Sequence, residues 1–328
     1  ADHIRHLDRT RFTALVACTP TVPALVERYR AAGAEVFFTP IPRLRARSPL
    51  VLPRLLGAAW KLRALVRRVR ADVVVANTSR AAYVATLAVG GTGVPLVWWV
   101  RDFLFGRRVF RLLERVPARI VCVSRAIRDF YGGEGDPRYQ VVYVGNDLYR
   151  RLADVTDERV RAERERWGFG PDDVVVGFMG RLVEEKGVED VVAAVERVHR
   201  DHPRVKLLVV GTGSNQEGDV EARVRSRVAV RGLKFVRFAG YQSDEALYYA
   251  LFDVFVLGSR IQDALPTSVI QAMMAGKPVV ATATGGTPEV VHDHGTGLLV
   301  PPASPGAMAD ALRALLEEPG LAGRVAEA

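Results

Sequence analysis

Short apolar runs alternate with longer amphipathic stretches along nearly the whole chain. The runs are rich in Val, Leu, Ile and Phe, which is typical of strands buried in a sheet, and the stretches between them have apolar residues at helical spacing. This alternation predicts an α/β fold in which helices cover parallel sheets. The predicted strands are residues 12–18, 35–38, 72–76, 96–100, 120–123, 141–144, 174–178, 205–210, 235–239, 254–257 and 278–281. The predicted helices include residues 22–32, 124–130, 187–199, 220–231, 244–252, 268–275 and 305–316.

The alternation pauses at residues 148–170, a charged segment that we interpret as a linker with one short helix. We therefore predict two doubly wound, Rossmann-like domains, residues 1–150 and 151–328, which face each other across a cleft. In such sheets, ligands bind beyond the carboxyl ends of the strands. The chain begins in an expected helix, residues 2–7, and ends in another. We expect roughly one strand-plus-helix piece to be missing at each end.

One uncharged run, residues 81–100, is long enough to resemble a membrane span. Three glycines and a proline near its middle favour a helix, a turn and a strand instead. Hydrophobic residues make up 49% of the chain and charged residues 25%, which is typical of a folded globular protein rather than a disordered one. Cys18 and Cys122 lie far apart without metal-ligand spacing, so we interpret them as reduced core residues.

The net charge of +9 is unevenly distributed. Residues 1–150 contain 25 basic and 11 acidic residues, whereas residues 151–328 contain 21 and 26. The basic residues are densest between Arg43 and Arg70, around an apolar core. This pattern fits a solvated helix face, and it equally fits a surface for an anionic membrane or a phosphorylated acceptor. Nucleic acid is a less suitable partner, because no zinc-finger or aromatic-interleaved pattern accompanies the charge.

The strand at 174–178 is followed by Gly180, Arg181 and Lys186. The glycine allows a sharp turn and a close approach of a ligand to the backbone. Two cations at the carboxyl end of a strand suit a diphosphate. The alternative is a pair of surface cations balanced by Glu184 and Glu185.

Two further predicted strands end in residues that could line a ligand site. Gly211 and Gly213 follow the strand at 205–210, but they lack the full dinucleotide fingerprint, so NAD is not predicted. Tyr241 follows the strand at 235–239 and either faces a nucleobase or packs at an edge.

The segment DALPTSVIQAMMAGKPVV, residues 263–280, predicts a loop, a helix and a buried strand. The helix is expected to begin near Ser268, and its amino terminus is suited to a phosphate. Asp263 lies just before that helix. Gln271 either completes a capping box with Ser268 or binds ribose hydroxyls.

Other catalytic and metal-binding patterns are absent from the sequence. His292 and His294 form an H-x-H pair without a third ligand nearby in sequence, so no metal site is predicted. No Ser/His/Asp order and no G-x-S-x-G elbow stands out.

The order of the segments GRLVEEKG, VVGTG, FAGYQSDEAL, SRIQDALPTSVIQAMMAGKPVVATATGGTPEVV and HGTGLLV resembles retaining nucleotide-sugar glycosyltransferases of family 4, which have the GT-B fold. The resemblance covers residues 170–328 and extends more loosely to the front half. It implies a chain that needs no metal or cofactor and takes its sugar from a nucleoside diphosphate, UDP or GDP being the expected carriers.

The resemblance also implies roles for individual residues. Arg181 and Lys186 would hold the donor diphosphate, and Asp263 would match the first acid of the family's E-x7-E motif, which touches the sugar hydroxyls. Gln271 would match the second acid, which binds ribose. The donor-binding set would be completed by Gly180, Gly211, Gly213, Tyr241 and the backbone of Leu265, Pro266, Thr267 and Ser268.

The sequence departs from that family at both acids, since Asp and Gln replace the usual two glutamates. A His often found near the front-domain acceptor loop is also absent, and Arg101 and Asp102 are our candidates for the acceptor side. We predict a cytoplasmic transferase, peripheral at the inner membrane face through residues 43–70, that modifies a hydroxyl acceptor which is lipid-linked or anionic. A catalytically degenerate relative that binds nucleotide or membrane is the alternative, and an epimerase of the same fold is a further one.

Overall fold

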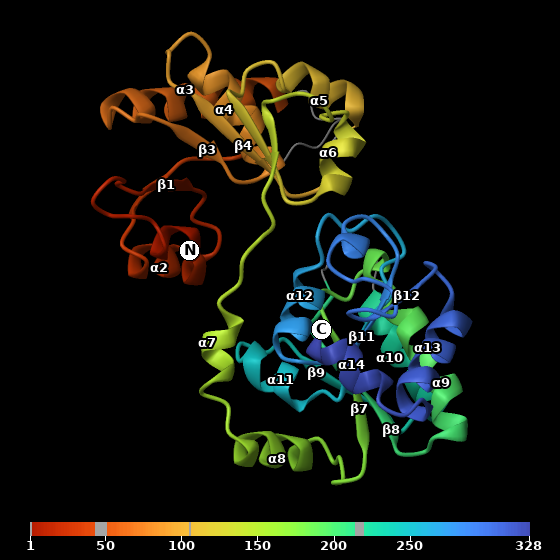
Figure 1. Cartoon of the computed structure of the whole chain (residues 1–328). Helices are drawn as coiled ribbons and strands as arrows, with labels where there is room; N and C mark the ends of the chain where they lie inside the picture. The colour runs from red at the N-terminus through yellow and green to blue at the C-terminus, as the bar shows by residue number, and fades with distance from the viewer. Residues whose placement is uncertain (1, 43–50, 105, 214–219) are drawn as a thin grey trace. The chain divides into compact units, whose positions relative to one another are not determined.

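The computed structural model describes residues 2–42, 51–104, 106–213 and 220–328. It divides into two compact units, Ala1–Tyr143 and Val144–Ala328 (Figure 1). The division precedes α7 (Leu148–Leu152) and α8 (Asp157–Arg166), both of which pack on α11 (Glu245–Leu251) of the second unit. The expectation of a linker at residues 148–170 is therefore wrong. Leu148 is fully buried in the core of the second unit.

The second unit is built on one six-stranded sheet in which every neighbouring pair is parallel. The strand order is β12-β11-β10-β7-β8-β9. Its strands are almost continuous apolar runs because helices cover both faces of a parallel sheet. They are β7 (Val174–Met179), β8 (Val205–Val210), β9 (Val236–Gly240), β10 (Val254–Leu257), β11 (Val279–Thr282) and β12 (Leu298–Val300).

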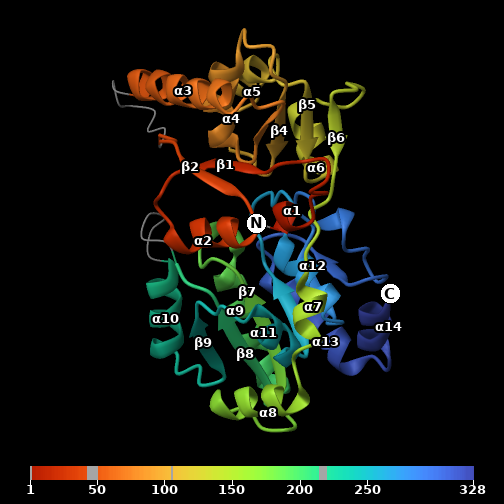
Figure 2. The same cartoon turned by 90° about the vertical axis from the view of Figure 1, so that its left-hand side faces the viewer.

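Five further helices belong to this unit, in addition to α7, α8 and α11. They are α9 (Val188–Asp201), α10 (Val220–Val230), α12 (Thr267–Met274), α13 (Pro305–Glu317) and α14 (Leu321–Glu327). Of the two 3-10 turns, η1 (Glu184–Lys186) lies between β7 and α9, and η2 (Thr287–Glu289) lies between β11 and β12. α13 packs on α9, and α14 packs on α13 (Figure 2). Together with the sheet they bury one continuous apolar core.

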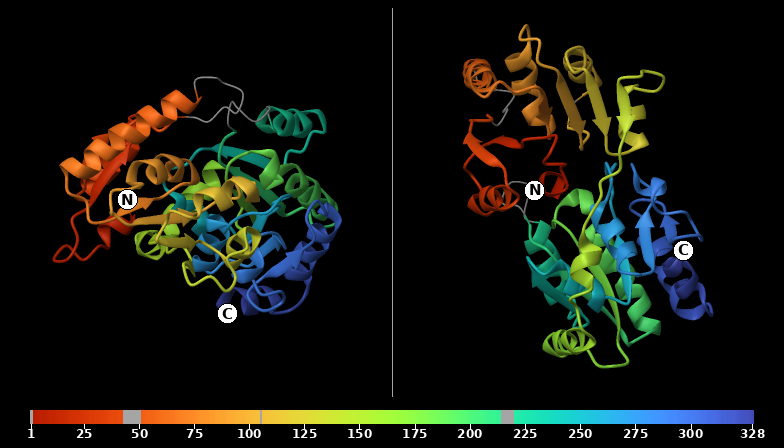
Figure 3. Two further views of the ribbon diagram at one scale, coloured as in Figure 1. Left: turned by 90° about the horizontal axis from the view of Figure 1, so that it is seen from above. Right: turned by 60° about the vertical axis from the view of Figure 1, so that its left-hand side comes forward.

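The first unit contains a four-stranded parallel sheet of order β3-β4-β5-β6 and a separate parallel pair, β1-β2. The four strands lie side by side in the right-hand view of Figure 3. The strands are β1 (Leu15–Cys18), β2 (Glu35–Phe38), β3 (Val74–Ala76), β4 (Leu96–Val100), β5 (Arg119–Cys122) and β6 (Tyr139–Val141). The helices are α1 (Asp2–Arg5), α2 (Pro23–Ala31), α3 (Val51–Arg68), α4 (Ser79–Val89), α5 (Arg107–Leu113) and α6 (Arg125–Tyr131).

The uncharged run at residues 81–100 forms most of α4, a glycine turn and β4, as predicted. Among the described residues, no helix is both long and apolar enough to cross a membrane. Neither cysteine forms a disulfide, and Cys122 is buried while Cys18 is half-buried.

Candidate active site

The loops that follow the strands of the second unit are joined through their backbones. Because all six strands are parallel, their carboxyl ends lie along one edge of the sheet. There the Gly180 N–H donates to the carbonyl of Val210 at 3.0 Å, and the Gly211 N–H donates to the carbonyl of Gly240 at 2.7 Å. The loop after β7 is therefore joined to the end of β8, and the loop after β8 is joined to the end of β9.

Three glycines in these loops lie directly against a carbonyl group of a neighbouring loop. All three have positive φ angles, 60°, 126° and 54° along the chain, which other residues adopt only with strain. A Cβ at any of them would overlap the facing carbonyl. The contacts are Gly187 with Gly258, Gly211 with Gly180, and Gly285 with Asp263.

Lys186 and Asp263, 77 positions apart in sequence, form an ion pair at this edge. Lys186 ends η1, and Asp263 lies in the loop after β10. The ammonium group donates to Asp263 Oδ2, and the Ser259 hydroxyl lies 3.5 Å from the same oxygen. Both charged side chains are largely buried, so the carboxylate is held in a fixed position with its charge balanced. The structure thus brings together two of the three predicted catalytic residues.

Arg181, the third, follows Gly180 on the loop after β7. Its side chain is exposed, and its Nη2 lies 3.8 Å from Glu185 Oε2. An exposed ion pair of this length contributes little to stability.

Arg260 was missed by sequence reasoning, although it holds the site together. Its guanidinium binds Asp190 of α9 with two nitrogens, at 2.7 and 2.8 Å, and also contacts Glu184. Its backbone N–H donates to the carbonyl of Glu185 at 2.9 Å. These hydrogen bonds and charges raise the pKa of Arg260, and they fix the loop after β10 to the start of α9. Only the fold could reveal this pairing, because Asp190 and Arg260 are 70 positions apart.

Gln271 does not form the predicted capping box. α12 begins at Thr267 with Pro266 at the N-cap position, and no side chain caps it. Instead, the Gln271 amide oxygen accepts from the Tyr249 hydroxyl at 3.1 Å, and its amide nitrogen donates to Glu245 at 3.0 Å. Both partners come from α11. The capping expectation is wrong because these tertiary partners occupy the buried amide.

Glu245, which sequence reasoning also missed, is the hydrogen-bond partner of the Gln271 amide nitrogen. The carboxylate accepts from Gln271 and from Arg151 of α7, each at 3.0 Å and each at Oε2. The side chain remains partly exposed. The Glu245 carboxylate therefore lies within hydrogen-bond distance of Gln271, the residue that matches the second acid of the E-x7-E motif.

The remaining donor-side candidates lie on the same loops. Leu265 and Pro266 are buried, whereas Thr267 is exposed and Ser268 is half-buried. Tyr241 directly follows β9, and its ring is 74% exposed, so it is not packed at the edge of the sheet. The Gly213 N–H donates to Glu221 Oε2 at 2.7 Å.

The acceptor-side candidates, Arg101 and Asp102, follow β4 in the first unit. Asp102 Oδ1 accepts from the Ser79 hydroxyl at 2.6 Å and from the Leu104 N–H at 3.2 Å, which ties β4 to the start of α4. The Arg101 guanidinium lies over the Trp99 ring, 5.1 Å from its centroid, and burial lowers its pKa.

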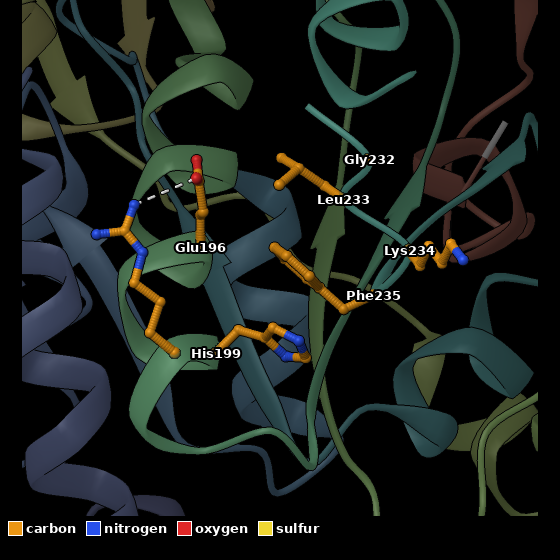
Figure 4. A pocket seen from close by; sticks show the side chains of 7 residues that line it. Glu196, His199, Gly232, Leu233, Lys234 and Phe235 are labelled. Atoms are coloured by element: carbon orange, nitrogen blue, oxygen red, sulfur yellow. Dashed lines mark hydrogen bonds and ion pairs between the residues drawn. The ribbon is translucent and has the colours of Figure 1, made fainter. Parts of the chain in front are cut away.

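One hollow of about 300 Å³ lies away from these loops (Figure 4). It is lined by the second half of α9 and the turn before β9, at the opposite edge of the sheet. There the His199 ring stacks on Phe235, with centroids 4.1 Å apart. This hollow brings together none of the candidate residues. Within the described ranges, no cluster of three or more His, Cys, Asp or Glu side chains is arranged to hold a metal.

Solved structures with a similar fold include Anabaena HepE in complex with UDP and glucose. Its TM-score is 0.82 at 23% identity, over 98% of this chain and 87% of that one. Sucrose-phosphate synthase from Thermosynechococcus elongatus has a TM-score of 0.76 at 20% identity, over 96% and 92%. The similarity confirms the predicted GT-B fold, with two Rossmann-like domains built on parallel sheets.

Similar sequences include glycogen synthase of Mycobacterium tuberculosis, 32% identical over 54% of this chain and 43% of its own length. α-D-Kanosaminyltransferase of Streptomyces kanamyceticus is 31% identical over 58% and 47%. The chain thus spans about half the length of the curated relatives it matches. The family model for glycosyltransferase family 4 matches residues 1–150, and that for glycosyl transferases group 1 matches residues 160–328, more than half of the chain. The chain therefore belongs to the glycosyl transferases of group 1.

Proposed function

We propose that this protein transfers a sugar from a nucleoside diphosphate sugar to a hydroxyl acceptor, with retention of anomeric configuration. The contact between Lys186 and Asp263 is the observation that carries the proposal. It joins a cation from the loop after β7 to a carboxylate from the loop after β10. An ammonium group placed in advance can stabilise the charge that develops on a leaving diphosphate. A carboxylate held beside it can accept hydrogen bonds from the sugar hydroxyls.

The donor would lie along the joined loops of the second unit. Arg181 would contact the diphosphate, and the exposed Tyr241 ring would offer a face to the base. The backbones of Gly180, Gly211 and Gly213 and of the segment from Leu265 to Ser268 would approach phosphate and sugar, and Gln271 would act on the ribose side. UDP is the first carrier to test, because Anabaena HepE was crystallised with UDP-glucose. GDP is the second carrier, and neither a metal nor a cofactor is required.

The acceptor would bind the first unit, where Arg101 and Asp102 are the candidate contacts. The net positive charge of this half suits an acceptor that is lipid-linked or anionic. A peripheral position at the inner face of the cytoplasmic membrane follows from the same charge.

The test is hydrolysis of a panel of UDP-, GDP- and ADP-sugars by the full chain, since a transferase releases some sugar to water. Lys186→Ala should lower turnover by about 100-fold or more, as expected for the loss of a preorganised charge. Lys206→Ala is a matched control, because Lys206 pairs with Asp173 and its side chain is 23% exposed, against 21% for Lys186.

The two variants should lose similar stability, while only Lys186→Ala loses turnover. Equal turnover in both variants would refute the role of Lys186. Donor binding without turnover across the panel would favour a degenerate, nucleotide-binding relative over an enzyme.

A further inference from the structure

Helix α3 of the first unit presents two different faces. Its inner face packs through Ala58 and Ala59 against Val84 of α4, with Leu55 and Leu62 beside them. The helix extends along the outer side of the unit (Figure 2). The two alanines allow a close approach to α4, and the Arg68 guanidinium at the end of the helix lies over the Phe37 ring of β2, 5.3 Å from its centroid.

The outer face carries large apolar side chains that are exposed among the described residues. Leu52, Leu56 and Trp60 are 62%, 52% and 70% exposed. They recur at every fourth position and therefore form a single row along the helix. Apolar surface of this size is unfavourable in water, and contiguous exposed patches of it mark interaction sites.

Cations border this row. Arg54, Lys61 and Arg68 are exposed and recur every seven residues, so they form a second row roughly a third of a turn from the first. Arg67 is also exposed near the end of the helix. No Asp or Glu occurs between Glu35 and Asp72, so no acidic side chain within the helix balances these charges.

We propose that the outer face of α3 docks the protein on an anionic lipid bilayer. Leu52, Leu56 and Trp60 would enter the boundary between headgroups and acyl chains, where an indole ring is favoured. Arg54 and Lys61 would lie at the level of the lipid phosphates, since long basic side chains extend toward them from a partly immersed helix. Residues 43–50, which the sequence analysis included in this surface, lie outside the described residues and are not needed.

Charge complementarity favours a bilayer over a second copy of the chain. A twofold interface would pack this face against the same face of a second copy. The cations of one copy would then face the cations of the other. An anionic bilayer instead offers negative headgroups to the cations and an apolar layer to the row of Leu52, Leu56 and Trp60 beside them. The docking surface specifies the peripheral membrane position proposed above but does not depend on glycosyl transfer, so vesicle binding and sugar transfer can fail separately.

The test measures partition of the full chain onto sedimented vesicles of phosphatidylcholine, alone or with one third phosphatidylglycerol. Binding is expected on the anionic vesicles only, and it should weaken as salt is raised. Each cation near such a surface contributes about fivefold, so Arg54→Gln with Lys61→Gln should lower the partition coefficient by roughly 20-fold or more. Trp60→Gln should lower it several-fold through lost apolar burial.

Val230→Gln and Arg161→Gln in the second unit are matched controls, because Val230 is 83% exposed and Arg161 is exposed. They should bind vesicles like the parent chain, and all variants should retain hydrolysis of the nucleotide sugar. Absence of binding to anionic vesicles, or equal losses in the control and α3 variants, would overturn the proposal. A dimer in sedimentation that Trp60→Gln dissociates would overturn it in favour of a second copy.

Discussion

Replacement of Gly187 by alanine tests whether backbone contact between loops fixes the candidate site. Gly187 lies between η1 and α9 with a φ of 60°. A Cβ there would overlap the carbonyl oxygen of Gly258 and lie 2.8 Å from its carbonyl carbon. Gly232 is a matched control, because its φ is 62° and a Cβ there would meet no atom within 4 Å.

The two variants separate the strain of the left-handed conformation from the overlap. Gly232→Ala should lose only the first contribution, about 1–2 kcal/mol of unfolding free energy. Gly187→Ala should lose the same amount and a further ~1–3 kcal/mol, because the Gly258 carbonyl must move to relieve an overpacked contact. Any such movement also draws Lys186 and Asp263 apart, since they lie on the two displaced loops.

The measurement is thermal unfolding of the full chain, with nucleotide-sugar hydrolysis measured on the same samples. For a unit the size of Val144–Ala328, each 1 kcal/mol lowers the melting temperature by about 2–4 °C. Gly187→Ala should therefore melt at least ~2 °C below Gly232→Ala and also lose activity, whereas Gly232→Ala should keep it. Equal melting temperatures and equal activities would refute the view that this contact constrains the site.

Two further predictions concern buried groups. Gln271→Glu would place a second carboxylate next to Glu245, so the pKa of the introduced acid should be raised above its unfolded value of about 4.3. An acid with a raised pKa stabilises the folded state only while it is protonated. The melting temperature of the Gln271→Glu variant should therefore fall further below that of the parent chain as the pH rises from 4 to 8. A difference in melting temperature that does not change with pH would contradict this. Burial raises the pKa of the Cys122 thiol to about 12, so iodoacetamide at pH 8 should modify Cys122 only after unfolding. Rapid labelling of Cys122, distinguished from Cys18 by peptide mapping, in the native chain would contradict this.

Much of the fold could be predicted because strands buried on both faces of a sheet read as uninterrupted apolar runs. The strands at 35–38, 96–100, 205–210 and 254–257 have the predicted bounds. The helices at 148–166 were mistaken for a linker because their charges are satisfied by distant partners. Arg159 pairs with Asp244 at 2.8 Å, and Arg164 pairs with Asp253 at 3.1 Å. Composition alone cannot distinguish such a packed charged helix from a solvated one.

The candidate site could be predicted as a set of residue types but not as a set of contacts. The resemblance singled out Lys186 and Asp263, yet nothing in their spacing indicates that they meet. Local patterning favoured a capping box at Gln271, whereas the fold supplied stronger partners in Tyr249 and Glu245. Arg260 lies within a motif that was noted, but its bidentate contact with Asp190 depends on the order of strands in the sheet.

The contacts of Gly187, Gly211 and Gly285 with carbonyl groups have a consequence for how donor preference could change. They fix the loops through main-chain atoms, so the loops would keep their positions when neighbouring side chains are exchanged. Little conformational entropy then remains to be lost when a donor binds, which leaves more of the interaction energy for affinity. Replacement of Tyr241 or Thr267 could thus redirect the site to another base or sugar without rebuilding it, and such a scaffold is a favourable starting point for engineering.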